Sequence, residues 1–187
     1  MPKLMKSVVL LMSAFAFISC SKNDIKIPNG KMIAVDGKFS ESEWNDAYVF
    51  KVSEVTNIYF KQSEDNLLMC LKSDKKFEGW VHVWLNGNVD ELTELYSKVA
   101  LEERTFQNPA WPQEWDASHS GWEATIASSQ EVVKEFKISR SRFKLSQWKI
   151  RFWIYRKFGP FFSDDEEKTI PENTSDKSSD GWMVLEF

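Results

Sequence analysis

The chain has 187 residues, enough for one domain with a two-layer hydrophobic core. Its formal net charge of -4 at pH 7 provides no basic surface, so we expect neither nucleic acid nor anionic lipid headgroups as partners. Aromatic residues are the unusual part of the composition, with 9 Trp and 14 Phe, and this favours a protein that presents rings to a polar partner.

The N-terminus has the pattern of a targeting segment. Lys3 and Lys6 precede an apolar run that ends at Ile18 and is too short to span a bilayer, so residues 1–19 are predicted to be a signal peptide. Cys20 follows the letters FIS, which resembles the lipobox of bacterial lipoproteins, where the cysteine is lipidated and becomes the first residue. A plain secretory peptide with an incidental Cys20 is the alternative. Lipidation would anchor the protein in the cell envelope of a Gram-negative bacterium, and we expect the outer membrane.

Residues 20–31 are polar and contain a Pro-Asn-Gly turn, so they are predicted to be the lipidated N-terminus and a tether outside the folded domain. The second cysteine, Cys70, lies in the apolar run NLLMCLKS and is expected to be a small buried strand residue without a disulfide partner.

The stretch VDGKFSESEWNDA, residues 35–47, is expected to open the domain. Asp36-Gly37 favours a tight turn, and Ser40 is placed to cap a short helical turn that holds two glutamates. Trp44 and Ala47 would then lie on one face of that turn and cover a sheet.

This opening, with the following NIYFKQSEDNLLMCLKSD, resembles the start of the family 9 carbohydrate-binding-module-like (DOMON-like) domains. Weaker similarities follow in GWEATIASS, KEFKIS and the closing GWMVLEF, so the resemblance spans residues 32–187. It implies a β-sandwich and, as in the well-studied members, sugar binding.

Period-two patterns and β-branched or aromatic residues predict strands for most of this domain. They cover residues 48–52, 56–61, 67–72, 79–86, 122–127, 132–138, 148–158 and 182–187. Residues 90–99 are predicted to form a short helix, residues 102–120 an irregular loop, and residues 163–180 a charged loop. The fold class is therefore all-β: a single antiparallel β-sandwich, jelly-roll-like, with short helical turns.

Two strands each carry two sets of side chains, one mostly aliphatic and the other mostly aromatic. One face is expected to carry Val81, Val83, Leu85, Ile150, Phe152 and Ile154, and the other Trp80, His82, Trp84, Arg151, Trp153 and Tyr155. A sugar lays its C–H face on an aromatic ring while planar polar groups bind its hydroxyls. We therefore predict an oligo- or polysaccharide site from Trp80, His82, Trp84, Arg151, Trp153 and Tyr155 with the loop residues Trp111 and Trp115. The alternative is that these rings fill a core.

Catalytic and metal-binding patterns are weak. His119 stands near Asp116 and Ser118, but no nucleophile elbow accompanies them, and no carboxylate pair stands out, so we expect no enzyme. The acidic run at residues 164–167 could bind Ca²⁺, although a solvated charge run is the simpler reading, and no other cofactor is expected. The remaining alternatives are a structural lipoprotein that docks another envelope protein, and a glycoside-processing enzyme.

Overall fold

The computed structural model describes residues 24–97, 100–107, 110–117, 120–125, 131–157 and 166–187. The expected signal peptide, Cys20, Ser118 and His119 lie outside these ranges, as do Asp164 and Asp165 of the acidic run. In the part of the chain that is described, no helix has the length and apolar character needed to cross a bilayer.

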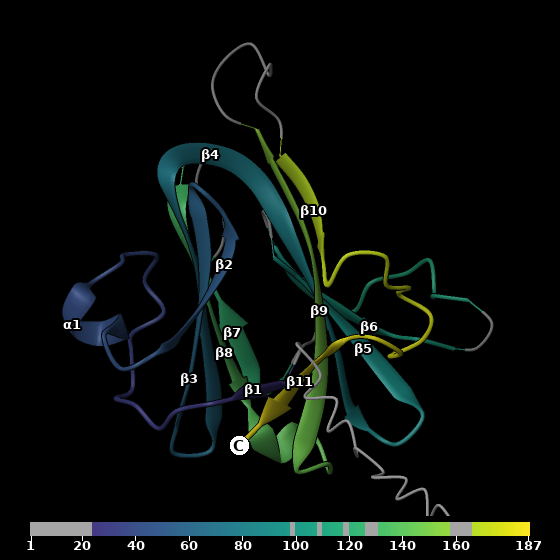
Figure 1. Ribbon diagram of the computed structural model, residues 1–187. Coiled ribbons are helices and arrows are strands. Elements are labelled where there is room, and N and C mark those ends of the chain that lie inside the picture. The colour runs from purple at the N-terminus through teal and green to yellow at the C-terminus, as the bar shows by residue number, and fades with distance from the viewer. Residues whose placement is uncertain (1–23, 98–99, 108–109, 118–119, 126–130, 158–165) are drawn as a thin grey trace, which may run out of the picture.

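The fold is a β-sandwich of two layers that share one strand (Figure 1). Sheet I contains, in spatial order, β2 (Tyr48–Ser53), β3 (Thr56–Ser63), the first part of β4 (Asn66–Asn88), β8 (Glu131–Ser139) and β7 (Trp122–Ala124). Sheet II contains β6 (Leu101–Thr105), β5 (Glu91–Ser97), the second part of β4, and β9 (Gln147–Lys157). The far edge of β9 pairs with β10 (Glu166–Ile170) and β11 (Met183–Glu186). These pairings are antiparallel, which confirms the predicted fold class.

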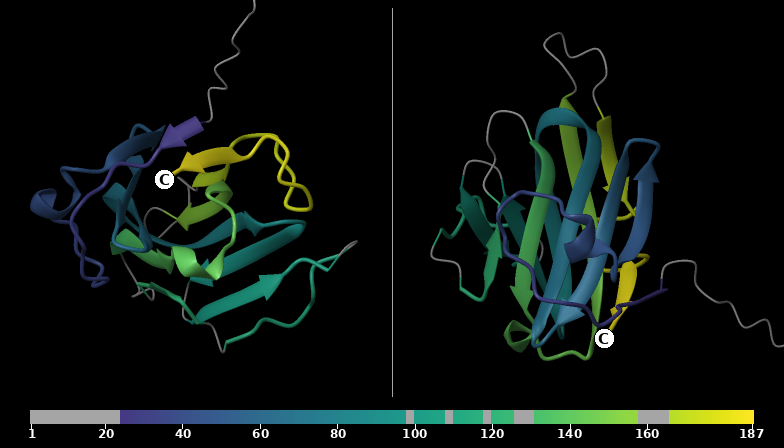
Figure 2. Two further views of the ribbon diagram at one scale, coloured as in Figure 1. Left: turned by 90° about the horizontal axis from the view of Figure 1, so that it is seen from below. Right: turned by 90° about the vertical axis from the view of Figure 1, so that its left-hand side faces the viewer.

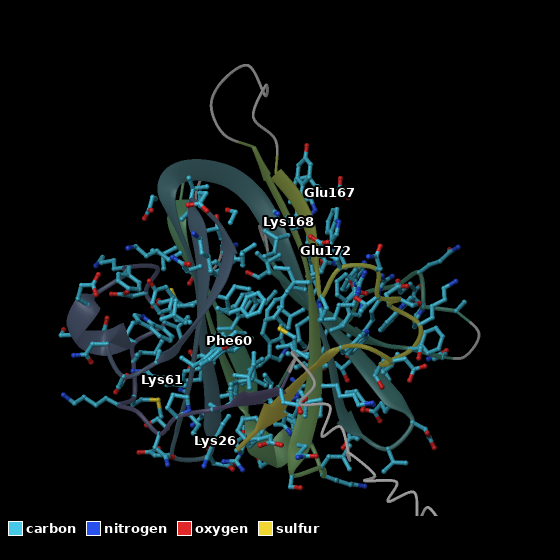
Figure 3. All side chains as sticks on the ribbon, in the orientation of Figure 1. Lys26, Phe60, Lys61, Glu167, Lys168 and Glu172 are labelled. Atoms are coloured by element: carbon cyan, nitrogen blue, oxygen red, sulfur yellow. The ribbon has the colours of Figure 1, made fainter. Side chains whose placement is uncertain are left out.

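Strand β4 has 23 residues and arches from one layer into the other. Its odd-numbered side chains face the space between the sheets in both parts: Leu67, Met69, Leu71, Val81, Val83 and Leu85 are all 3% exposed or less. Ile150, Phe152 and Ile154 of β9 complete the inner side of sheet II, as the alternation predicts. Phe60 of β3 meets Phe152 across the core with ring centroids 6.0 Å apart (Figure 3).

A cover formed by residues 33–47 lies on the outer side of sheet I (Figure 2, right). Helix α1 (Glu41–Trp44) places Trp44, 1% exposed, against Leu68 and Cys70, which confirms the predicted helical turn and the buried cysteine. Buried Glu135 holds both the Asp36-Gly37 turn and helix α1 in place. It accepts hydrogen bonds from the backbone N–H groups of Asp36 and Gly37 and from the Trp44 indole.

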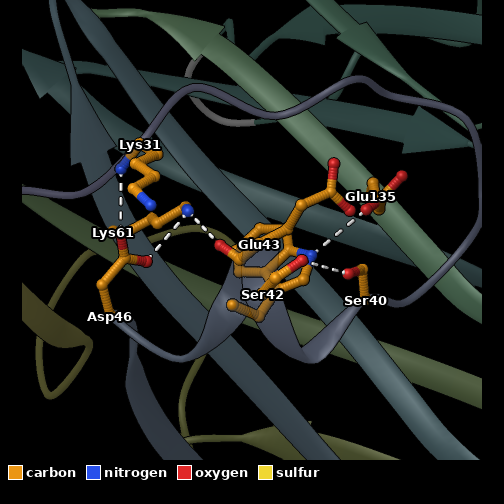
Figure 4. A network of polar contacts seen from close by, with 8 residues as sticks. Lys31, Ser40, Ser42, Glu43, Asp46, Lys61 and Glu135 are labelled. Atoms are coloured by element: carbon orange, nitrogen blue, oxygen red, sulfur yellow. Dashed lines mark hydrogen bonds and ion pairs between the residues drawn. The ribbon is translucent and has the colours of Figure 1, made fainter.

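One detail of the cover differs from expectation, and a second was not predicted (Figure 4). The Ser40 hydroxyl forms a hydrogen bond with the Ser42 hydroxyl and does not cap the helix as expected. Lys61 of β3 is fully buried beneath α1, where its ammonium binds the Glu43 carbonyl and lies 2.9 Å from Asp46 Oδ1. The cover is therefore fixed by charge and hydrogen bonds as well as by Trp44.

Three segments expected to be helical or irregular are strands. Residues 90–99 contain β5, because pairing with β4 buries Thr93, Leu95 and Ser97, whereas an isolated helix of that length would be marginal. Residues 102–120 contain most of β6, and residues 163–180 contain β10. The predicted tether contains β1 (Asp24–Lys26), which pairs in parallel with β11 and buries Ile25, so the folded domain begins before Met32.

Candidate functional site

The outer face of sheet II gathers all eight predicted ligand-binding residues. Strand pairing sets them in rows: Trp80 opposite Tyr155, His82 opposite Trp153, and Trp84 opposite Arg151. On the other side of β4, Tyr96 lies opposite His82 and Glu94 opposite Trp84. The segments at residues 110–117 and 171–182 cross this side of the sheet (Figure 1), and the first of them brings Trp111 and Trp115 to the face.

Three rings form the part of the face next to β10. The ring centroid of Trp80 lies 4.5 Å from that of Tyr155 and 6.2 Å from that of Trp153, and all three side chains are half-buried. The Trp153 indole donates a hydrogen bond of 3.0 Å to Glu167 of β10, which Figure 3 labels at this edge. These rings support one another and remain partly open to solvent.

Glu94 is the polar centre of the face. It is 1% exposed, and both carboxylate oxygens are engaged: Oε1 lies 2.5 Å from His82 Nδ1, and Oε2 accepts a 2.6 Å hydrogen bond from Arg104 Nε. Charge-assisted hydrogen bonds of this length are strong and fix orientation. Glu94 therefore holds an imidazole and a guanidinium in set positions.

His82 and Arg104 lie among aromatic rings. The His82 ring is 16% exposed and has the rings of Tyr96, Trp153 and Trp115 at centroid distances of 4.6, 5.1 and 6.0 Å. The Arg104 guanidinium lies 4.2 Å from the centroid of Trp115 and also donates to the Pro112 carbonyl. With Nδ1 committed to Glu94, Nε2 is the ring atom of His82 left for a ligand.

Tyr96 adds a hydroxyl to the same place. Burial raises the pKa of Tyr96 above its usual range, and the negative charge of Glu102 acts in the same direction. The phenol is therefore protonated near neutral pH and can both donate and accept a hydrogen bond.

Trp84 and Arg151 lie deeper than predicted. They are 6% and 8% exposed, and the guanidinium stacks 4.3 Å from the Trp84 ring while its Nε donates to Thr174 of the 171–182 loop. Burial lowers the pKa of Arg151, and the charges of Asp176 and Glu94 oppose that effect. These two residues support the face from below.

Three buried donors in this layer have no acceptor among the described atoms: Trp84 Nε1, Trp111 Nε1 and Arg151 Nη1. Trp111 packs on Phe106, with ring centroids 5.2 Å apart, beside Trp84 and Trp182. Buried donors in proteins nearly always have an acceptor. These three N–H groups are therefore available to bind an acceptor that is not among the described atoms.

Sequence reasoning missed Glu94, Tyr96 and Arg104. The segment ELTELYS fits a helical stripe through Leu92, Leu95 and Tyr96, which concealed a second pattern of alternate residues, Leu92, Glu94 and Tyr96, all on one side of a strand. The acidic residue Glu94 between Leu92 and Tyr96 was the available signal that this side of the strand carries a functional group. Within the described ranges, no three His, Cys, Asp or Glu residues are arranged to hold a metal ion.

Comparison with known proteins agrees with the fold. No protein-family model matches the sequence, and no curated protein matches it. A family 9 carbohydrate-binding module from Caldicellulosiruptor kristjanssonii in complex with cellotriose is similar in structure, with a TM-score of 0.56 and 10% sequence identity over 87% of this chain and 92% of that chain. A second structure of such a module from the same organism, in complex with glucose, has a TM-score of 0.52 and 9% identity over 87% of this chain and 94% of that chain. The resemblance to family 9 predicted from the sequence is thus confirmed at the level of the fold.

Proposed function

We propose that this protein binds carbohydrate without catalysis, on the outer face of sheet II. The observation that carries the proposal is the Glu94 cluster: a buried carboxylate that holds His82 and Arg104 rigidly between half-buried aromatic rings. A sugar needs both parts, because its C–H face packs on a ring while its hydroxyls require oriented polar groups.

The roles follow from the chemistry of the half-buried side chains. Trp80, Trp153 and Trp115 supply apolar surface, and His82 Nε2 and the Tyr96 hydroxyl supply hydrogen bonds to sugar hydroxyls. Rigid groups lose little entropy on binding, which favours affinity. The two solved structures of similar fold hold cellotriose and glucose, which supports a saccharide as ligand.

A glycoside-processing enzyme fits this arrangement less well. Hydrolysis requires a carboxylic acid that gives up its proton to the leaving group. Glu94 accepts short hydrogen bonds on both oxygens and is covered, which keeps it an acceptor that supports its neighbours. We therefore expect that any glycan that binds is recovered intact.

The test is a glycan array read out by binding, followed by titration of the hits with tryptophan fluorescence. The triple variant Trp80→Ala, Trp115→Ala, Trp153→Ala should lose binding, while Tyr48→Ala, an exposed aromatic on sheet I, should retain it. Far-UV circular dichroism and thermal unfolding check that the variants are folded. No bound glycan on the array, or full affinity in the triple variant, would refute the proposal.

Anchoring through Cys20 is a separate part of the proposal. The lipobox-like FIS-Cys sequence supports a lipidated protein at the outer membrane that holds glycan near the cell envelope. Radiolabelled palmitate should enter the wild-type protein and be absent from Cys20→Ser. If the protein docks another envelope protein instead, cross-linking should recover that partner and Trp153→Ala should abolish the cross-link with no glycan required.

A further inference from the structure

A second opening lies on the same outer face of sheet II, further along β4 and β9 from the rings. It is a groove of about 650 Å³. Its floor is formed by Asn86 and Lys149, which lie opposite each other in the β4–β9 pairing. One wall is the β4–β5 hairpin and the other is the 171–182 loop at Lys177, Ser178 and Ser179. The volume is within the range of about 300–1,000 Å³ found for ligand pockets.

The hairpin wall is rigid. Asn86 Nδ2 donates to the carbonyls of Asn88 and Glu91, and Asn88 Nδ2 donates to the Glu91 carboxylate. The Asn88 side-chain oxygen in turn accepts from the backbone of Lys144. The groove is therefore preformed on this side, with the Asn86 amide oxygen free as an acceptor among the described atoms.

Two lysines line the groove. Lys149 and Lys177 contribute two ammonium groups, and neither makes an ion pair or a side-chain hydrogen bond with any described residue. Asp90 is the one acid among the described lining residues, and the carboxylates of Glu91 and Asp180 beside the groove accept hydrogen bonds from Asn88 and Ser178. Buried Arg151 lies two positions from Lys149 on the same side of β9 and adds its charge to the local field.

An apolar surface accompanies this charge. Leu92 and Phe106 line the inner end of the groove and belong to the cluster that contains Trp84 and Trp182. Val89, at the hairpin tip, is 73% exposed at the rim. A ligand here meets the apolar side chains of Leu92 and Phe106 and two unpaired cations, which together suit a sugar ring that carries an anionic substituent.

We infer that this groove is a second saccharide subsite, selective for a sugar unit that bears a carboxylate or a sulfate. The inference rests on the proposed function, because it extends the same glycan from the rings to the groove. His82 and Asn86 are four positions apart on strand β4, or about 13 Å, so one oligosaccharide can reach both places. Two linked contacts raise affinity more than either alone.

The experiment compares three matched probes on the full protein: cellotriose, its uronate form oxidised at C6, and its sulfate ester. At about 0.01 M salt one or both acidic probes should bind about tenfold more tightly than cellotriose, and about 1 M salt should remove the difference by screening. The two acidic arms separate a uronate ligand from a sulfated one, and preference for either supports the inference.

Variants locate the effect. Lys149→Glu with Lys177→Glu should abolish the preference for the acidic probes over cellotriose, whereas Lys38→Glu with Lys51→Glu, an equal charge change on the sheet I side, should keep this preference. Lys177 is an exposed loop residue, so Lys177→Glu alone should reduce the preference for the acidic probes without affecting the folding of β9. Equal affinity for all three probes, or a preference that survives the groove variants, would overturn the inference while the proposed function stands. Failure of every probe and every array glycan would instead refute the proposed function.

Discussion

Replacing Glu94 by Gln tests whether a buried carboxylate organises the proposed binding face on sheet II. Glu94 accepts two charge-assisted hydrogen bonds, of 2.5 Å with His82 and 2.6 Å with Arg104. A glutamine keeps one acceptor oxygen and turns an NH₂ group toward the other donor, so one such bond, worth about 1.5–3 kcal/mol, is lost and a donor is left unpaired. We expect the free energy of unfolding to fall by about 2–3 kcal/mol. A typical domain has about 5–15 kcal/mol of stability, so the variant should remain folded.

Denaturant unfolding and fluorescence titration with an array glycan measure the two consequences. Because His82 and Arg104 lose their fixed orientation, affinity should fall about tenfold, which corresponds to about 1.4 kcal/mol. The matched control is Glu123→Gln, which removes a carboxylate that contacts Lys137 at an equal 2.6 Å but is 53% exposed. An exposed pair contributes little, so this control should change stability by about 0.5 kcal/mol or less. Equal losses in the two variants, or unchanged sugar affinity in Glu94→Gln, would refute the reasoning.

Three further predictions concern the scaffold. Gly87→Ala should destabilise the fold by about 1–3 kcal/mol in denaturant unfolding, because a Cβ there would lie 2.4 Å from Cγ of Phe143, and a neutral result would contradict the packing. Burial raises the pKa of the Cys70 thiol well above its usual range, so Cys20→Ser protein should react with a thiol reagent only after unfolding; fast labelling of the native state would count against it. Burial also raises the pKa of Glu135, although the hydrogen bonds that it accepts act in the opposite direction. Because the pKa is lower in the unfolded chain, the unfolded chain loses this proton first as the pH rises, and the free energy of unfolding falls. The stability advantage of wild type over Glu135→Gln, measured by denaturant unfolding, should shrink from about pH 4 to pH 7, and a growing advantage would show the opposite sign.

The sandwich was predictable because its central strands separate residue types cleanly. In VHVWL and IRFWI, Val, Leu, Ile and Phe alternate with His, Trp and Arg. A strand has only two sides, so the inner and outer sets follow from the sequence. The cover was predictable for a local reason, since the Asp36-Gly37 turn and Trp44 lie within one short stretch.

The polar centre of the site was not predictable because its partners are far apart in the sequence. Glu94 faces His82 and Arg104 only after β5 pairs with β4 on one edge and β6 on the other. A helical stripe through residues 92–99 explained the same apolar residues, and strand pairing decided between the two patterns. Likewise, nothing local indicates that Thr174 and its loop cover Arg151.

The arch of β4 constrains how this protein can change in length. Odd positions point inward both before and after the bend, from Leu67 to Leu85. Deleting a single residue between Lys72 and Trp80 would leave sheet I and its cover in place but turn the second half of the strand over, sending His82 and its neighbours into the core. Insertions or deletions in the arch should therefore be tolerated only in steps of two. An odd number of residues would leave sheet I folded but would turn the outer side chains of sheet II, which form the proposed site, inward.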